Sequence, residues 1–114
     1  MKSGKYVPDR GDVVWLNFTP QAGHEQRGKR PALILSPQIY NKKTSLCVCL
    51  PITSKVKGYP FEVALPDALE IQGVILSDQI KNLDFLVRDI SFICRVSDEV
   101  VEQVQKNVLA LVGG

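Results

Sequence analysis

The sequence predicts a mainly β protein with added α-helix (α+β), in which five to seven short strands form a small closed barrel or a strongly curved sheet. Two observations lead to this prediction. Short apolar runs rich in β-branched and aromatic residues recur between turn residues, a pattern typical of strands. The last segment changes to a helical period of hydrophobic residues, which predicts one C-terminal helix.

Three strands are expected in the first half of the chain. They cover Asp12–Phe18, Pro31–Leu35 and Leu46–Ile52. Pro51, inside the third run, has no backbone donor and therefore predicts an edge strand or a bulge. A short helical turn over Gln38–Lys42 is expected before the third strand, with Ser36 as its N-cap and Pro37 at its first position.

The second half of the chain contains shorter apolar runs. They predict strands at Phe61–Leu65, Val74–Leu76 and Asp89–Arg95. From Val100 to Val112, valines and leucines fall at helical spacing with polar residues on the opposite face. Ser97 suits the N-cap of this helix and Gly113 suits its end. Asp98 and Glu99 suit the positive end of its dipole. We expect its valine stripe to pack on the barrel as core.

Length and composition bound the class of protein. A chain of 114 residues fits one domain, 1–114, and its 45% hydrophobic and 23% charged residues are ordinary for a globular protein. No apolar stretch approaches the roughly 20 residues that span a bilayer. The segment Met1–Tyr6 has no apolar secretory region. A cytoplasmic protein, with no membrane contact, is the resulting expectation.

The three cysteines are an odd number, which argues against a disulfide framework. Cys47 and Cys49 would share one face of a strand, either as half of a metal site or as two small buried hydrophobes. A zinc site needs four ligands, usually CxxC-like pairs joined by His, and the single His is distant in sequence. We expect buried thiols, Cys94 included, and no metal.

Charge is distributed unevenly along the chain. Residues 1–60 carry ten Lys/Arg against three acidic residues, a net +7, whereas residues 61–114 carry four against nine, a net −5. A basic half on a protein of net charge +2 indicates a local surface for an anionic ligand, of which nucleic acid is the commonest. The alternative is a set of ordinary solvated loops.

The most informative stretch is the loop at 23–31, which reads GHEQRGKRP. Pro31 restrains Arg30 to an extended conformation where the loop meets a strand, and a guanidinium held there suits bidentate recognition of phosphate. A solvated loop whose glycines only permit the turn is the alternative. A second stretch, Thr53–Lys55, ends a strand with two hydroxyls and a cation. These groups could bind phosphate oxygens or simply cap a turn.

Taken together, these motifs resemble the MazF/PemK family of toxin ribonucleases. The resemblance covers residues 6 to 82 and rests on Gly11-Asp12, the loop GxEQxGxRP, Pro51 with Thr53, the tract Lys57–Phe61, and Asp78-Gln79 with Lys81. The loop motif is hard to meet by chance, whereas the last 30 residues match only in pattern. The resemblance implies an SH3-like barrel of the CcdB/MazF type with short helices and a C-terminal helix.

The resemblance also implies a sequence-specific endoribonuclease, an mRNA interferase, that cuts single-stranded mRNA at a short motif without a metal or other cofactor. The 2′-OH of the substrate attacks the adjacent phosphorus and leaves a 2′,3′-cyclic phosphate and a 5′-OH. By similarity, Arg30, Thr53 and Glu25 would be catalytic. Arg30 and Thr53 would donate to the non-bridging oxygens, and Glu25 is the natural candidate for the base. His24 could act as the acid or lie on the loop surface.

Candidate RNA contacts follow from the same comparison. Phe18 and Tyr59 are candidate stacking residues, with core packing as the alternative for each. Trp15 could face the core or a partner. The other candidate RNA-binding residues are His24, Gln26, Lys29, Ser36, Ser54, Lys55, Gln79 and Lys81.

Partners are implied by the family as well: a homodimer with a groove shared between subunits, and a cognate acidic antitoxin that occupies this groove. Two other functions stay open. One is a non-enzymatic, CcdB-like poison that binds gyrase, and by analogy it needs an aromatic C-terminal tip, whereas this chain ends LVGG. The other is a small-barrel RNA-binding module without catalysis.

Overall fold

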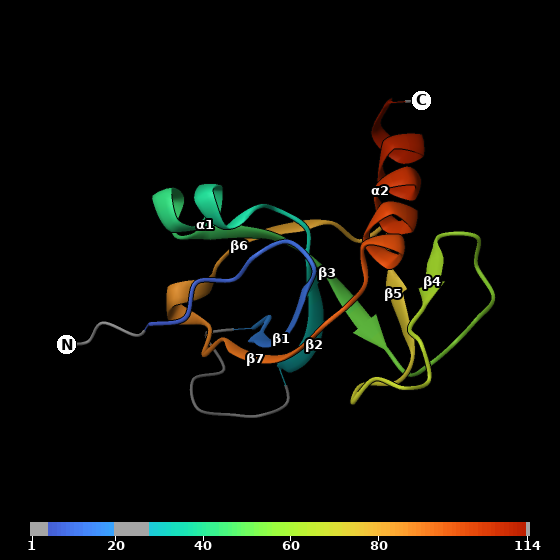
Figure 1. The fold of residues 1–114 in the computed structure, drawn as a ribbon, viewed down its shortest axis with the longest axis horizontal. Helices are drawn as coiled ribbons and strands as arrows, with labels where there is room; N and C mark the ends of the chain where they lie inside the picture. The colour runs from blue at the N-terminus through green and yellow to red at the C-terminus, as the bar shows by residue number, and fades with distance from the viewer. Residues whose placement is uncertain (1–4, 20–27, 114) are drawn as a thin grey trace.

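The computed structural model describes residues 5–19 and 28–113, which form one curved antiparallel sheet with helices on its margins (Figure 1). The described strands are β1 (Asp12–Asn17), β2 (Lys29–Ile34), β3 (Leu46–Thr53), β4 (Glu62–Ala64), β5 (Val74–Leu76), β6 (Lys81–Asp84) and β7 (Ser91–Arg95). The helices are α1 (Gln38–Thr44), the 3-10 turn η2 (Phe85–Val87) and α2 (Asp98–Gly113). Within the described ranges, no helix is long and apolar enough to cross a membrane.

Strand β3 is the centre of the sheet. The strand order is β4-β5-β3-β2-β1-β7, and β6 also pairs with β3. Among the described strands, β4 and β7 end this series without pairing to each other, so the sheet is strongly curved rather than closed by hydrogen bonds. The predicted class, mainly β with a C-terminal helix, is confirmed.

Pro51 was expected at an edge or a bulge, and the edge position is wrong because β3 is central. On one side β3 pairs with β6 as far as Cys49 and with β5 from Ile52 onward. On the other side Leu35 N donates to Val48 O, so by the alternation of an antiparallel ladder the nitrogen of Pro51 points away from β2. The nitrogen of Pro51, which cannot donate, therefore lies on the side of β3 where pairing changes from β6 to β5.

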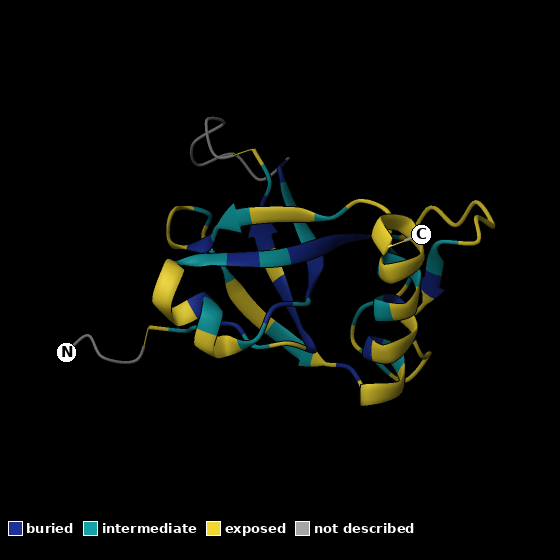
Figure 2. Cartoon of the chain, turned by 90° about the horizontal axis from the view of Figure 1, so that it is seen from above, coloured by how far each residue is buried: buried dark blue, intermediate teal, exposed yellow. Residues whose placement is uncertain are grey.

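Both faces of the central strands are buried, which explains why these strands read as continuous apolar runs. One face packs against α2 and β5 through a cluster that contains Val13, Leu33, Leu50, Ile52, Ile75, Val101 and Val104. The opposite face packs around Phe85 of η2 through Val14, Leu16, Ala32, Ile34, Cys47 and Cys49. In Figure 2 the buried segments are concentrated in the central strands, between helices that are exposed over much of their surface. Trp15, 37% exposed, faces outward from β1.

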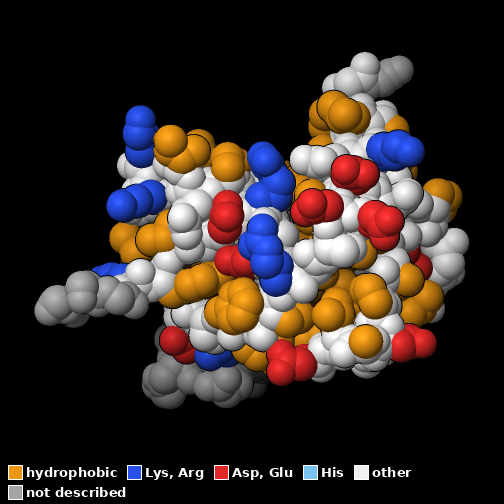
Figure 3. Space-filling model, viewed as in Figure 1, with side chains coloured by type: hydrophobic (Ala, Val, Ile, Leu, Met, Phe, Trp, Pro, Cys, Tyr) orange, Lys and Arg blue, Asp and Glu red, His pale blue; other side chains and the backbone are white. Residues whose placement is uncertain are grey.

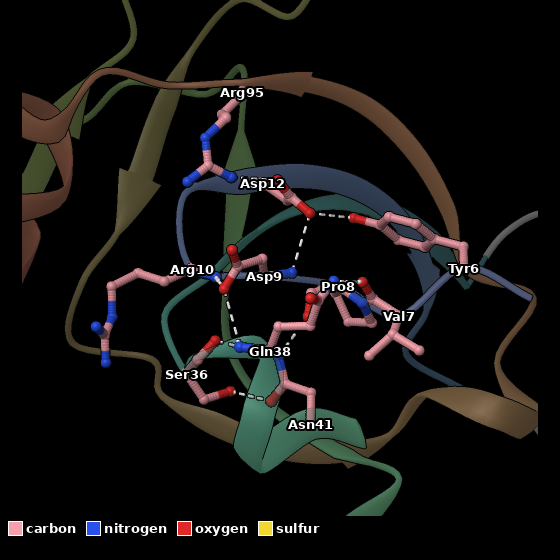
Figure 4. A network of polar contacts seen from close by, with 10 residues as sticks. All are labelled: Tyr6, Val7, Pro8, Asp9, Arg10, Asp12, Ser36, Gln38, Asn41 and Arg95. Atoms are coloured by element: carbon pink, nitrogen blue, oxygen red, sulfur yellow. Dashed lines mark hydrogen bonds and ion pairs between the residues drawn. The ribbon is translucent and has the colours of Figure 1, made fainter. Parts of the chain in front are cut away.

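The N-terminal segment fixes helix α1 through a network of polar contacts (Figure 4). The expected cap was Ser36, and this prediction is wrong: its hydroxyl donates to Asn41 Oδ1 at 2.6 Å and accepts from Val48 N at 2.8 Å. Pro37 is itself the N-cap residue, and Asp9 Oδ1 accepts from Gln38 N at 2.8 Å. A carboxylate 29 residues away therefore caps the helix.

The same segment is tied to the first and last strands. Asp12 accepts from the Tyr6 hydroxyl and pairs with Arg95, whose Nη1 lies 2.7 Å from Asp12 Oδ1. Burial and the bond to Asp12 raise the pKa of Tyr6 far above its ordinary value, so this phenol remains a neutral donor.

Helix α2 begins after Ser97 and ends at Gly113, as predicted, but its last turns are more exposed than expected. Ser97 Oγ accepts from Val100 N at 3.4 Å, consistent with the expected cap, and Val101 and Val104 are buried against the sheet. Beyond Val108 the apolar side chains lose contact with the core: Leu109, Leu111 and Val112 are 65%, 46% and 68% exposed. The expectation that the whole stripe packs as core is therefore wrong for the last turns.

Candidate active site

A polar pocket of about 240 Å³ lies where β2, β3 and β5 meet the loop between β3 and β4. It is lined by Arg30, Thr53, Lys55, Lys57, Tyr59, Glu62, Leu76 and Gln79. Three cations and one carboxylate give the lining a net positive charge, which suits an anionic ligand. The two predicted motifs, which are separate in the sequence, thus contribute to one hollow.

Arg30 enters this pocket from β2, where it pairs with Leu16 of β1. The carbon of its guanidinium lies 5.9 Å from the centre of the Phe18 ring, within the range of a cation–π contact. Phe18 is half-buried and packs partly against the cluster around Leu16. The ring therefore acts both as a margin of the core and as a platform that orients the guanidinium.

Thr53 is the last residue of β3, on the same face of the strand as Cys49 and Pro51. Its Oγ1 accepts from Lys55 N at 3.1 Å, which fixes the rotamer and leaves the hydroxyl proton to be donated elsewhere. An oriented hydroxyl donor beside a guanidinium can stabilise negative charge on a phosphoryl oxygen.

Gly73 allows the close approach that holds Thr53 in place, and sequence reasoning missed it. Its φ is +125°, and a Cβ there would lie 2.2 Å from the carbonyl oxygen of Thr53. Only glycine combines this backbone angle with this proximity. The backbone of the turn before β5 therefore lies directly against the residue that enters the pocket.

The loop between β3 and β4 supplies one wall of the pocket. Tyr59 is 53% exposed, so its ring is available to a ligand rather than packed in the core. The carboxylate of Glu62 accepts from Lys57 N at 3.0 Å and from Gly58 N at 2.9 Å. Glu62 was not a candidate from the sequence, although it directly follows the tract that carries the family resemblance.

Gly28 closes the predicted loop next to this pocket. Phe18 N donates to Gly28 O at 2.8 Å, and a Cβ on Gly28 would lie 1.8 Å from Thr19 Oγ1. Phe18 and Thr19 therefore lie next to Gly28, which precedes Arg30 by two residues. His24, Glu25 and Gln26 lie outside the described residues.

The four remaining described candidates, Lys29, Ser36, Ser54 and Lys81, do not line this pocket. Ser54 is exposed next to Thr53, and Lys81 is exposed at the start of β6. Lys29 Nζ forms an ion pair with Asp89 Oδ2 at 2.9 Å. Ser36 is buried beside α1, where its hydroxyl is engaged as described above, and the structure does not bring it to this pocket.

Two of the three cysteines are buried as expected for small hydrophobes, whereas Cys94 is only partly buried. Cys47 and Cys49 are fully buried, and the neighbouring Cys47 thiol and burial raise the pKa of Cys49. Within residues 5–19 and 28–113, no three His, Cys, Asp or Glu side chains cluster as metal ligands.

A second hollow, of about 630 Å³, lies between α1 and α2. It is lined mainly by apolar atoms of Leu35, Pro37, Tyr40, Val48, Val108 and Leu109, with Arg10, Ser36 and Gln105. Figure 3 shows hydrophobic side chains on both sides of this hollow, toward α1 and toward α2. We call this hollow the helix groove.

Comparison with known proteins identifies the family. Residues 9–112 match the family described as PemK-like, MazF-like toxin of type II toxin-antitoxin system. The chain is 43% identical over 109 residues to the endoribonuclease toxin MazF of Escherichia coli K12, covering 96% of this chain and 97% of that protein. The crystal structure of MazF from Deinococcus radiodurans superimposes with a TM-score of 0.88 at 49% identity, covering 96% of this chain and 100% of that one.

A crystal structure of the MazE–MazF complex from Deinococcus radiodurans is similar too, with a TM-score of 0.86 and 43% identity over 96% of this chain and 98% of that one. These matches extend over the strands that build the polar pocket and over helix α2. The chain therefore belongs to the PemK-like, MazF-like family of toxins of type II toxin–antitoxin systems.

Proposed function

We propose that this chain is a toxin endoribonuclease that cuts single-stranded mRNA at a short sequence without a metal. The observation that supports this most is the convergence of Arg30 and Thr53, from two different strands, on one positively charged pocket. A guanidinium and a hydroxyl are both donors, which is what a phosphorane with negative non-bridging oxygens requires.

The proposed reaction is an internal transfer. The 2′-oxygen of the substrate forms a bond to the adjacent phosphorus, and the bond from phosphorus to the 5′-oxygen of the next nucleotide breaks. A base removes the 2′-OH proton and an acid protonates the leaving 5′-oxygen. Arg30 and Thr53 donate to the non-bridging oxygens. Glu25, five residues before Arg30 in the sequence, is the proposed base, and His24 is a candidate acid.

Recognition is assigned to the rim of the same pocket. The exposed ring of Tyr59 suits stacking on an unpaired base, and Lys55 and Lys57 suit backbone phosphates. Gln79 offers an amide that can both donate and accept at a base edge. Phe18 orients Arg30 and can stack at the pocket margin.

Two protein partners belong to the proposal. A cognate acidic antitoxin would compete with RNA for the basic surface; the family is one of toxins of toxin–antitoxin systems, and in a similar structure MazF is bound to MazE. A homodimer is supported by the helix groove and by the exposed apolar end of α2, which nothing in the described chain covers. A cytoplasmic location, where mRNA is accessible, and a single domain over 1–114 complete the proposal.

The test is a digest of a long unstructured RNA in EDTA, with fragment ends mapped. Wild type should cut at one short motif and leave cyclic phosphate, and Arg30→Ala should lose roughly 10³-fold in rate. Lys43→Ala, an exposed cation on α1, is the charge-matched control and should cut normally. An intact RNA with folded wild type would overturn the proposal and favour a gyrase-binding poison or a binding module without catalysis.

A further inference from the structure

Glu62 is hydrogen-bonded to three consecutive residues of the loop between β3 and β4, through both its side chain and its backbone. The carboxylate of Glu62 accepts from Lys57 N at 3.0 Å and Gly58 N at 2.9 Å, and Glu62 N donates to Tyr59 O at 3.1 Å. Hydrogen bonds from N–H groups to a carboxylate are stronger than neutral ones. Glu62 therefore fixes the stretch of loop that carries Lys57 and Tyr59 into the pocket.

A carboxylate in a pocket for RNA needs a structural reason, because it repels phosphate. Between the described residues, no ion pair joins Glu62 to Lys55 or Lys57, and the carboxylate oxygens accept from backbone donors instead. Its contacts are thus those of a loop anchor. The two lysines keep their charge for a ligand.

The backbone of Gly58 imposes the same loop shape independently. Its φ is +84°, a conformation that glycine adopts readily and other residues adopt at a cost. A Cβ built on Gly58 has no neighbour within 4 Å, so an alanine there would meet no clash. Any effect of Gly58→Ala would therefore come from the loop conformation alone.

We propose that Glu62 is a positioning residue for nucleobase selection: it holds Tyr59 and Lys57 so that one unpaired base beside the scissile phosphate stacks on Tyr59. This inference rests on the proposed ribonuclease function. Arg30 and Thr53 act on the phosphorus, whereas the loop decides which base is accepted next to it. Loosening the loop should therefore relax sequence selection more than it slows the chemistry.

The test compares Glu62→Gln and Gly58→Ala with wild type on a long RNA and on a short RNA that contains the preferred motif. In Glu62→Gln the amide keeps one acceptor, but its NH2 group faces a backbone N–H that it cannot satisfy. We expect KM to rise roughly tenfold for both variants with kcat changed less than about twofold, and new cut sites that differ at one base position.

Controls separate this role from simple destabilisation. Glu102→Gln removes an exposed carboxylate on α2 and should leave KM and the cut sites unchanged. Thermal unfolding of each variant and the Kd for a motif RNA with 2′-deoxyribose at the cut provide readouts that do not depend on turnover. Kd should rise with KM while the cut motif broadens, a change that loss of folded protein cannot produce.

Three results would overturn the inference, and the last of them is distinct because it also overturns the proposed function. If wild type cuts and Arg30→Ala does not, but Glu62→Gln and Gly58→Ala keep the wild-type KM and cut sites, the loop does not select the base. The same conclusion follows if kcat alone falls. If wild type itself leaves RNA intact, the proposed function fails and this inference fails with it.

Discussion

The two hollows of this protein differ in size and in the chemistry of their linings. The helix groove, about 630 Å³, is lined chiefly by apolar side chains of two helices and the strand between them. The polar pocket, about 240 Å³, collects three cations, a hydroxyl, an amide and a phenol at the ends of strands. The apolar lining of the larger hollow suits a protein surface, and the polar groups of the smaller one suit a phosphate. The proposed active site is therefore the smaller hollow, chosen by the chemistry of its lining rather than by its volume.

The two regions are nevertheless connected through one buried residue. Ser77, fully buried, accepts from Asn107 Nδ2 of α2 at 3.0 Å and donates to Phe61 O, next to the anchor Glu62. Asn107 lies between Gln105 and Val108, which line the helix groove. Ser77 therefore links the loop beside the polar pocket to the helix that forms one side of the helix groove.

After Arg30→Ala, the largest effect should come from removing the Thr53 hydroxyl in the polar pocket. Thr53→Ala should lower kcat by roughly 10²–10³, because it removes one donor to the developing phosphorane. Thr53→Ser keeps the hydroxyl and should recover most of the rate. Single-turnover cleavage of a short RNA measures both variants. A Thr53→Ala enzyme with wild-type kcat would show that the pocket chemistry does not depend on this hydroxyl.

The next largest effect should come from Gly73, whose backbone lies against the carbonyl of Thr53. Gly73→Ala should cost about 3 kcal/mol of unfolding free energy, because the Cβ would collide with the carbonyl of Thr53 at a positive φ. Urea denaturation measures this loss. Gly113→Ala, where a Cβ has no neighbour within 4 Å, is the matched control and should change stability little. Equal stability of the two variants would contradict the close approach described here.

Much of the fold was predictable because the central strands are buried on both faces. Strands β1, β2, β3 and β5 appear in the sequence as apolar runs, and their positions were confirmed within two residues at each end. β6 was missed because Lys81 and Asn82 are exposed and the strand pairs on one side only. A pattern of hydrophobicity cannot reveal a strand that buries so little.

Arg30 and Thr53 could be proposed from the sequence because each side chain can itself donate to a phosphate oxygen, and the structure brings both to one pocket. The candidate site was not predictable where one residue acts on another's backbone. Glu62 binds amides of its own loop, and Gly73 lies against the carbonyl of Thr53. Ser36 was assigned as a cap, but Asp9 performs that role from a distant part of the chain. Such contacts depend on the folded topology.

The helix groove provides the third comparison. If it is the surface for a second copy, Leu109→Glu should weaken dimerisation roughly 30-fold, because a charge replaces an exposed apolar side chain at its margin. Sedimentation equilibrium measures the change. Ile39→Glu alters an equally exposed residue of α1 that does not line the groove, and it should leave the dimer intact. Equal weakening by both variants would indicate a different interface.

The smallest effect is expected for Ser77, the buried residue that is hydrogen-bonded both to Phe61 and to Asn107 of α2. Ser77→Ala should cost about 1–2 kcal/mol of unfolding free energy, because Phe61 O and Asn107 Nδ2 each lose a partner. Ser91→Ala, at an exposed position of β7, is the control for urea denaturation. Since Phe61 precedes Glu62, the Ser77→Ala variant should also raise KM for RNA slightly while kcat stays constant. A stability loss with unchanged KM would mean that Ser77 supports α2 alone, and that the groove and the pocket are independent.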